Sequence, residues 1–292
     1  MTKRQQFTLC SFLLVFSLFG SVYGQNSKWT EVKSEHGLLS SNQKTGVGDQ
    51  HSMTFKLDIN SLKHQLKTAP TRGMKNQKSN ILVSFPNAHG TFEKFTVYEA
   101  PVLSQELAAR YPNIKTYVGF SEDGSGTRIR FSVTPLGLNA MITALEKDMV
   151  LISPTAKGRS SLYSVYERGH HRDKKLEQFV CSTIDETSES ANKSEALRGA
   201  NDQTLRTFRV AISGTAEYTN TWDDGDDTNG TVQEDALAQV VSTLNRSNEV
   251  FEVDMAITMT LVSGISILYT DASTDPYSAN LNSEHPMRHM TF

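Results

Sequence analysis

Apolar residues recur at every second position in short stretches between residues 53 and 167. In the clearest stretch, "TRIRFSVT", three apolar residues alternate with three polar ones. The apolar three are Ile129, Phe131 and Val133, and the polar three are Arg128, Arg130 and Ser132. A period of two is typical of a half-buried antiparallel strand, with one face in the core and the other in water. This part of the chain is therefore expected to form a β-rich domain.

Six further stretches in this region are predicted to be strands, and turn signals such as "EDGSG" separate them. They are "FKLDI", "NILVSFP", "FEKFTVYEA", "IKTYVGF", "LNAMIT" and "DMVLIS". Two short helices are expected among them, one from Asn60 and one near Val102 that covers "SQELAARY".

Residues 182–203 have a different composition, with almost no large apolar side chain and many Ser, Glu, Asp and Asn residues. Such a segment buries too little apolar surface to offset the conformational entropy lost on ordering. It is predicted to be an exposed linker between two domains.

After the linker the pattern becomes strand, long helix, strand. "RTFRVAIS" and "MAITMTLV" alternate as strands do, and "TVQE" at 231–234 is a capping box that begins a helix of about twenty residues. Leu237, Val241, Leu244 and Phe251 share one stripe of that helix. "ISILYT" is predicted to be a further strand. The βαβ unit is typical of an α/β sheet. The predicted fold class of the whole chain is α+β, with a β-rich domain followed by an incomplete α/β domain.

The N-terminus has the features of a secretory signal peptide. Lys3 and Arg4 precede the apolar run "FTLCSFLLVFSLFG", and Val22 and Gly24 suit the −3 and −1 positions of a cleavage site. The run is shorter than the roughly 20 residues that span hydrocarbon. Residues 1–24 are therefore predicted to be removed, which leaves a secreted or extracytoplasmic protein without a membrane anchor.

Charge and cysteine content bear on whether the chain binds nucleic acid or membranes and whether it forms a disulfide bond. The 29 basic and 32 acidic residues give a net charge of −3, so nothing indicates nucleic acid or an anionic membrane as a partner. Cys10 lies in the predicted signal peptide. Cys181 is then the one cysteine of the mature chain, which excludes an internal disulfide.

Long stretches of the chain carry a resemblance to a known family. "FPNAHGTFEKFTVYEAPVLSQELAARYPNIKTYVGF" and "TRIRFSVTPLGLNAMI" resemble the propeptide of secreted bacterial zinc metalloproteases of the reprolysin-like (metzincin) type. "LRTFRVAISGTAEYTNTW", "NRSNEVFEVDMAITMTLV" and "YTDASTDPYS" resemble the opening of their catalytic domain. The resemblance implies a precursor with a signal peptide at 1–24, a β-rich propeptide domain at 25–181, a polar linker at 182–203 and the N-terminal part of a catalytic domain at 204–292.

The resemblance also implies zinc chemistry that this chain lacks. Such enzymes hold zinc through the histidines of H-E-x-x-H-x-x-G-x-x-H, and the glutamate acts as general base on the zinc-bound water. The 292 residues do not contain this motif. His285 and His289 have helical spacing, but Pro286 stands where the glutamate belongs and no third histidine follows, so chance spacing is the favoured interpretation. We expect no catalytic residue and no bound zinc here.

Cys181 and Arg198 are candidate site residues of the precursor. The resemblance implies that Cys181 supplies a thiolate that occupies the zinc and keeps the enzyme latent, while the alternative is a small apolar residue at a strand end. Arg198, followed by Gly199 in the polar linker, is a candidate cleavage point for release of the propeptide, and a solvated arginine is the alternative.

Two other groups have simpler interpretations. "DDGDDTNG" at 223–230 resembles a calcium loop in composition, but its glycine and glutamate positions do not match one. An acidic solvated turn before a helix N-terminus is favoured. His170 and His171 lie in a charged run and are expected to be solvated.

The leading hypothesis is a truncated precursor of a secreted zinc metalloendopeptidase, cut before its zinc-binding helix and inactive. Full-length relatives would act on protein or peptide substrates, and the propeptide would bind the protease domain. The alternative is a non-catalytic, propeptide-type binding or inhibitory protein.

Overall fold

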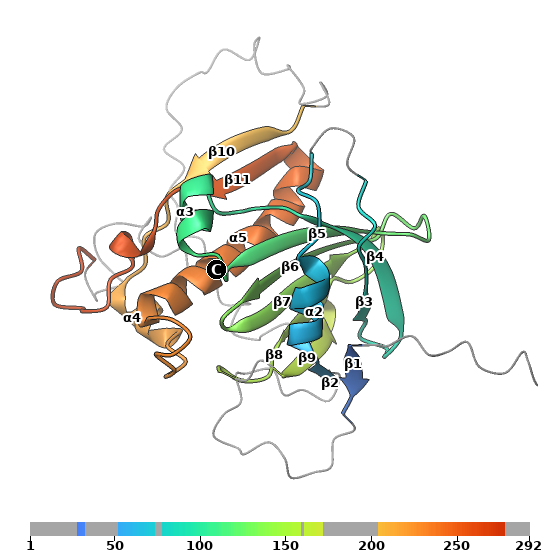
Figure 1. Ribbon diagram of the computed structural model, residues 1–292, viewed down its shortest axis with the longest axis horizontal. Helices are drawn as coiled ribbons and strands as arrows, with labels where there is room; N and C mark the ends of the chain where they lie inside the picture. The colour runs from blue at the N-terminus through green and yellow to red at the C-terminus, as the bar shows by residue number, and fades with distance from the viewer. Residues whose placement is uncertain (1–27, 33–51, 74–77, 159–160, 172–203, 278–292) are drawn as a thin grey trace, which may run out of the picture.

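The computed structural model describes residues 28–32, 52–73, 78–158, 161–171 and 204–277 (Figure 1). The first four ranges form one nine-stranded antiparallel sheet in the order β1-β2-β9-β8-β7-β6-β5-β4-β3. Its strands are β1 (Trp29–Glu31), β2 (Met53–Leu57), β3 (Leu82–Pro86), β4 (Phe92–Glu99), β5 (Lys115–Ser121), β6 (Arg128–Thr134), β7 (Gly137–Thr143), β8 (Val150–Pro154) and β9 (Leu162–Glu167). The seven strands predicted between residues 53 and 167 are confirmed as β2 to β8, and the sequence analysis missed β1 and β9.

The two edge strands of this sheet approach each other through their side chains. Trp29 of β1 donates a hydrogen bond from Nε1 to the carbonyl of Ser84 in β3, at 3.1 Å. The Trp29 ring also lies 6.1 Å from the ring of Phe85, between centroids. The sheet therefore curls, and its inner face encloses an apolar core.

The inner core consists of alternate residues of the strands and of one helix. Helix α2 (Ile59–Leu66) begins where Asp58 accepts a hydrogen bond from the backbone N–H of Ser61 at 3.0 Å, and it buries Leu62 and Leu66 in the core. The predicted helix at Asn60 is thus confirmed. Every residue of this core belongs to the chain before residue 172: Trp29, Phe55, Leu57, Leu62, Leu66, Ile81, Val83, Phe85, Phe95, Val97, Tyr117, Ile129, Phe131, Val133, Leu138, Ala140, Ile142, Val150, Ile152, Tyr163 and Val165.

Residues 204–277 contain the predicted βαβ unit. Strands β10 (Arg206–Val210) and β11 (Ile257–Leu261) pair in parallel, and the long helix α5 (Val232–Met255) connects them. Two shorter elements are α4 (Ala216–Thr221) and the 3₁₀ helix η3 (Ile265–Ile267). The predicted strand "ISILYT" is wrong, because this segment forms the 3₁₀ helix η3 and then pairs with the rest of the described chain only through one bridge between Gly214 and Leu268.

Helix α5 begins and ends with local signals. Thr231 accepts from the N–H of Glu234 and the Glu234 carboxylate accepts from the N–H of Thr231, at 3.3 and 2.9 Å, which confirms the capping box. The helix ends at Met255 and is capped by Ala256, whose φ of 53° is left-handed. The predicted apolar stripe is buried, except for a half-buried Phe251.

Helix α5 lies against the outer face of the large sheet, over β5 to β7, and also contacts β11 (Figure 1). Strand β6 is therefore buried on both faces, and Arg130 and Ser132 are each only 1% exposed. The expectation of a half-buried strand was wrong here, because a helix more than a hundred residues further along the chain covers its polar face.

A second apolar core joins the two parts of the chain. Its residues before the predicted linker lie around helix α3 (Gln105–Arg110), which confirms the predicted helix near Val102, and those after it lie mainly on α5. They are Val102, Leu103, Leu107, Tyr111, Ile114 and Leu136, packed with Ala236, Leu237, Ala238, Val240, Val241, Leu244, Leu261 and Leu268. Among the described helices, none is both long and apolar enough to cross a membrane.

Candidate functional site

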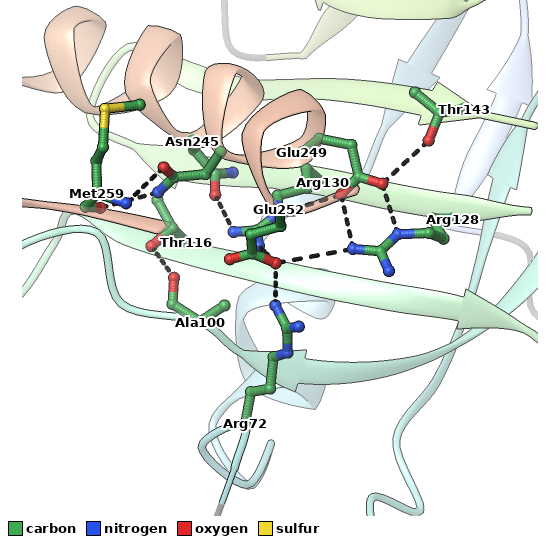
Figure 2. Close-up of polar contacts among 11 residues, drawn as sticks. Arg72, Ala100, Thr116, Arg128, Arg130, Thr143, Asn245, Glu249, Glu252 and Met259 are labelled. Carbon is green, nitrogen blue, oxygen red and sulfur yellow. Dashed lines mark hydrogen bonds and ion pairs between the residues drawn. The ribbon is translucent and has the colours of Figure 1, made fainter. Parts of the chain in front are cut away.

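Five charged side chains meet between the large sheet and α5, and we call them the arginine–glutamate cluster (Figure 2). They are Arg72, Arg128, Arg130, Glu249 and Glu252. Arg130 lies between the two carboxylates, with Nε 3.3 Å from Glu249 Oε2 and Nη2 2.5 Å from Glu252 Oε2. The side chains of Arg130, Glu249 and Glu252 are 2%, 2% and 5% exposed, so water contributes little to their solvation.

The other two arginines close the cluster from its rim. Arg128 Nε lies 2.6 Å from Glu249 Oε1, and Arg72 pairs with Glu252. Thr143 donates a hydrogen bond to Glu249 Oε1 at 3.1 Å. Glu249 thus has two arginine partners, and Glu252 has three, because Arg128 Nη2 also lies 3.8 Å from Glu252 Oε2.

The cluster follows from two simple periodicities in the sequence. Ser242, Asn245, Glu249 and Glu252 are three, four and three residues apart, which places them on one face of α5. We call this face the polar stripe. It meets the outward-facing residues of β6 in order: Ser132 Oγ lies 2.7 Å from Ser242 Oγ, and Arg130 Nη1 donates to Asn245 Oδ1 at 3.3 Å. The sequence analysis noted the polar residues of β6 but not their partners on the helix.

The charges of the cluster stabilise one another against burial. Burial disfavours the ionised form of Glu252, but the guanidinium groups of Arg130 and Arg72 outweigh it, and the pKa of Glu252 lies below its ordinary value. A buried charge without a partner costs several kcal/mol. The cluster therefore stabilises the contact between the sheet and α5 only while each buried charge keeps its partners.

The face of α5 next to the polar stripe holds β11. The Asn248 side chain donates from Nδ2 to the carbonyl of Met259 at 2.9 Å and accepts from the Met259 N–H at 2.8 Å. The helix is thus fixed through one face to its own βαβ unit and through the adjacent face to the large sheet. These contacts can bind and orient a helix, and they include no nucleophile paired with a base.

A second group of charges lies where α5 begins. Carboxylate oxygens of Asp223, Asp224 and Asp235 lie within 4.8 Å of one another. Asp224 N–H donates to Asp235 Oδ2 at 3.2 Å, while Asp235 Oδ1 has no hydrogen-bond partner among the described residues. Asp223 is exposed, as the solvated-turn interpretation predicts, but Asp235 is only 2% exposed. Burial, with the charges of Asp224 and Asp223 adding to it, raises the pKa of Asp235 to about 6.

Asp235→Asn should stabilise the protein at neutral pH. The raised pKa means that the folded state disfavours the ionised carboxylate, so the penalty is absent below the ordinary pKa near 3.9, grows as the pH rises towards 6 and is complete above it. Asparagine keeps an oxygen that can accept from the Asp224 N–H. We expect a gain of about 1–2 kcal/mol in the free energy of unfolding at pH 7 that disappears near pH 4.

Denaturant unfolding at both pH values, in buffer with a chelator, measures this effect. Asp227→Asn, in an exposed residue of the same loop, removes the same charge and should change stability by less than about 0.5 kcal/mol. A loss of stability in Asp235→Asn at pH 7 would show that the folded protein needs this charge.

The described residues do not fit a zinc site. Among them the three aspartates are the one group of at least three His, Cys, Asp or Glu side chains whose ligand atoms come together. Three carboxylates suit a hard cation such as Ca²⁺, whereas zinc in proteins is mostly held by histidine and cysteine. His64 is exposed on α2, and His89 lies 3.2 Å from Glu167.

The site residues named from the sequence lie outside the described residues. This holds for Gly24, Cys181, Arg198, His285 and His289, and for the side chains of His170 and His171, whose backbone forms the 3₁₀ helix η1 (Arg168–His171). The latency thiolate, the cleavage point and the chance spacing of the last two histidines therefore stay predictions.

Comparison with known proteins finds a similarity that covers the glutamates of the cluster and not its arginines. No curated protein and no solved structure matches the chain. Residues 204–288 match the family model described as "Metallo-peptidase family M12B Reprolysin-like", and members of this family are zinc-dependent in general. The arginines lie outside the matched range and the glutamates lie inside it. The segment 204–288, which contains α5 with Glu249 and Glu252, is thus similar to the M12B reprolysin-like metallopeptidases.

Proposed function

We propose that the chain comprises the propeptide and the first part of the catalytic domain of a secreted zinc metalloendopeptidase precursor. The observation that carries this proposal is the division of the arginine–glutamate cluster. The family match covers α5 and its strands, and the β-rich part before it covers the polar stripe of that helix. A separate domain that packs on the long helix of a peptidase segment suits a propeptide.

These 292 residues would not hydrolyse peptide bonds by themselves. The zinc ligands and the general base of the family motif are absent from the sequence, and among the described residues the one group of three or more metal-ligating side chains consists of aspartates. In relatives that carry the motif, zinc supplies an activated water for peptide hydrolysis. What this chain supplies is the scaffold: a helix held in place by the β-rich domain.

The remaining sequence predictions fit the same proposal. Residues 1–24 would direct export, the segment around Arg198 would be the cleavage point, and Cys181 would be the latency thiolate in a chain that also carries the zinc ligands. The substrates of such an enzyme would be proteins or peptides.

Two measurements test this function. The purified chain with added zinc should show no peptide hydrolysis that a chelator abolishes, and such turnover would refute the proposed inactivity. Reading the gene and its transcript past the codon for Phe292 should reveal H-E-x-x-H-x-x-G-x-x-H in one of the frames. A stop codon without this motif in any frame would refute the precursor.

A non-catalytic binding protein is the second candidate, and the completeness of the inner core favours it. That core contains no residue from beyond position 171, so the β-rich part has what it needs to act as a separate binding domain. Inhibition of a reprolysin-like peptidase by the purified chain in a one-to-one ratio, together with the absence of the zinc motif from the gene, would favour this candidate.

A further inference from the structure

Helix α5 has two faces of different character. One face packs through Leu237, Val241 and Leu244 in the second apolar core and holds β11 through Asn248. The other face is the polar stripe, which meets β6 through hydrogen bonds and ion pairs (Figure 2). A helix that is apolar all round is typical of a permanently buried core element, and α5 does not have that pattern.

The matching face of the sheet is also polar. The side chains of β6 that point at α5 are Arg128, Arg130 and Ser132, while its inward residues belong to the inner core. Both surfaces can therefore be hydrated when they are apart. Interfaces between domains of one chain are more polar than obligate interfaces, and the contacts between β6 and α5 fit that description.

Contacts beside the polar stripe strengthen the same interface. The segment 102–104 pairs with the end of β11: Ser104 N–H donates to the Leu261 carbonyl at 2.9 Å, and Leu261 N–H donates to the Val102 carbonyl at 2.7 Å. Val102, Leu103 and Tyr111 pack in the second apolar core. The interface thus combines backbone pairing, apolar contact and buried charge.

We infer that the arginine-bearing face of the β-rich domain is a docking surface for the polar stripe of α5, which holds the two parts together after the chain between them has been cut. The partner is the α5-bearing segment of the same protease. Cleavage between the two parts would then not free the peptidase segment, and release would require the arginine–glutamate cluster to open. This regulation rests on the proposed function, whereas the docking itself needs neither zinc nor hydrolysis.

The test is to cut the full chain at one engineered site. A recognition sequence for a site-specific protease is placed between residues 171 and 204, the folded chain is cleaved, and the products are separated by size-exclusion chromatography at neutral pH. We expect both fragments to elute together as one species. Separate elution of folded fragments from the unaltered sequence would overturn the inference.

Charge reversal at the rim then shows whether the cluster carries the association. Arg72 pairs with Glu252 and its side chain is 29% exposed, so Arg72→Glu sets two negative charges against each other at the edge of the interface. Like charges placed opposite each other at an interface cost several kcal/mol. We expect the dissociation constant of the cleaved fragments, measured by dilution, to rise about tenfold or more.

The matched control is Lys63→Glu, which makes the same change of charge on the exposed side of α2. It should leave the dissociation constant unchanged. Arg72→Gln, which removes the charge without reversing it, should weaken association in the same direction by a smaller factor, and it serves as the second variant where Arg72→Glu does not fold before cleavage. Equal dissociation constants for the Arg72 variants and Lys63→Glu would overturn the role of the cluster.

The cleavage experiment and the search for the zinc motif in the gene can fail independently of each other. Fragments that stay together in a protein whose gene lacks the zinc motif would support the docking surface and refute the precursor. Fragments that separate in a protein whose gene contains the motif would refute the docking surface and leave the precursor standing.

Discussion

Arg130→Ala should lower the free energy of unfolding by about 3–5 kcal/mol, because it takes from two buried carboxylates the one arginine of the cluster that is itself buried. Arg130 is 1% exposed and contacts Glu249, Glu252 and Asn245. After its loss Glu249 keeps Arg128 and Glu252 keeps Arg72, but both of these arginines are partly exposed at the rim. The variant therefore measures the cost of an incomplete cluster.

The pH dependence of this loss follows from Glu252. Its pKa is below the ordinary value in the folded protein, so ionised Glu252 stabilises the fold fully above the ordinary pKa near 4.3, and this contribution is lost as the pH falls through the lowered value. Arg130 supplies much of that lowering. The difference between the wild-type protein and Arg130→Ala should therefore be largest at neutral pH and smaller in acid.

Denaturant unfolding of the uncut chain at pH 7 and in acid measures both effects. Arg168→Ala removes an exposed arginine and should cost less than about 0.5 kcal/mol. Arg130→Met combined with Glu249→Gln and Glu252→Gln removes the buried charges together, and it should cost less than Arg130→Ala. A loss below about 1 kcal/mol in Arg130→Ala would mean that water or the rim arginines replace the missing partner.

Local pattern was sufficient to predict most of the elements. The alternation of strands β2 to β8 and the capping box of α5 are signals within a few residues, and the structure confirms them. β1 has only three residues, too few for a period of two to be recognised. β9 carried the signal in "LYSVYE", where Tyr163 and Val165 are buried on one face, and it was overlooked.

The site depended on pairing between distant segments, which one sequence does not specify. Alternation in β6 predicts that Arg128, Arg130 and Ser132 share a polar face, but a polar face usually contacts water. The sequence did contain a sign that this face of β6 is buried, namely the polar stripe on α5. A helix with regularly spaced polar residues beside an apolar stripe can contact two different surfaces, one polar and one apolar. Asp235 was missed for a related reason: an acid in the first turns of a helix is ordinarily favourable and solvated.

Phe131→Ala should also lower the free energy of unfolding by about 3–5 kcal/mol, but through the inner core of the β-rich domain and not through its contact with α5. Phe131 is the neighbour of Arg130 in β6 and points into the inner core, where it is 1% exposed. Its ring lies 4.9 Å from that of Tyr117 in a stacked arrangement and 5.0 Å from that of Phe85. Truncation leaves a cavity among these rings, and the curled sheet cannot collapse to fill it.

The measurement is denaturant unfolding followed by tryptophan fluorescence, to which Trp29 of the same core and Trp222 both contribute. Phe208→Ala, in the exposed Phe208 of β10, is the matched control and should cost about 1 kcal/mol or less. A loss in Phe131→Ala as small as in this control would contradict the closed inner core.

The two neighbouring residues of β6 separate the fold of the β-rich domain from its docking. After cleavage of the chain, Phe131→Ala should lower the stability of the β-rich fragment itself, because the inner core lies entirely within it. Arg130→Ala should instead weaken the association of the two fragments, since its partners Glu249 and Glu252 lie on the other one. If both variants unfolded the β-rich fragment equally, the outer face of the sheet would be part of its own fold rather than a surface for a partner.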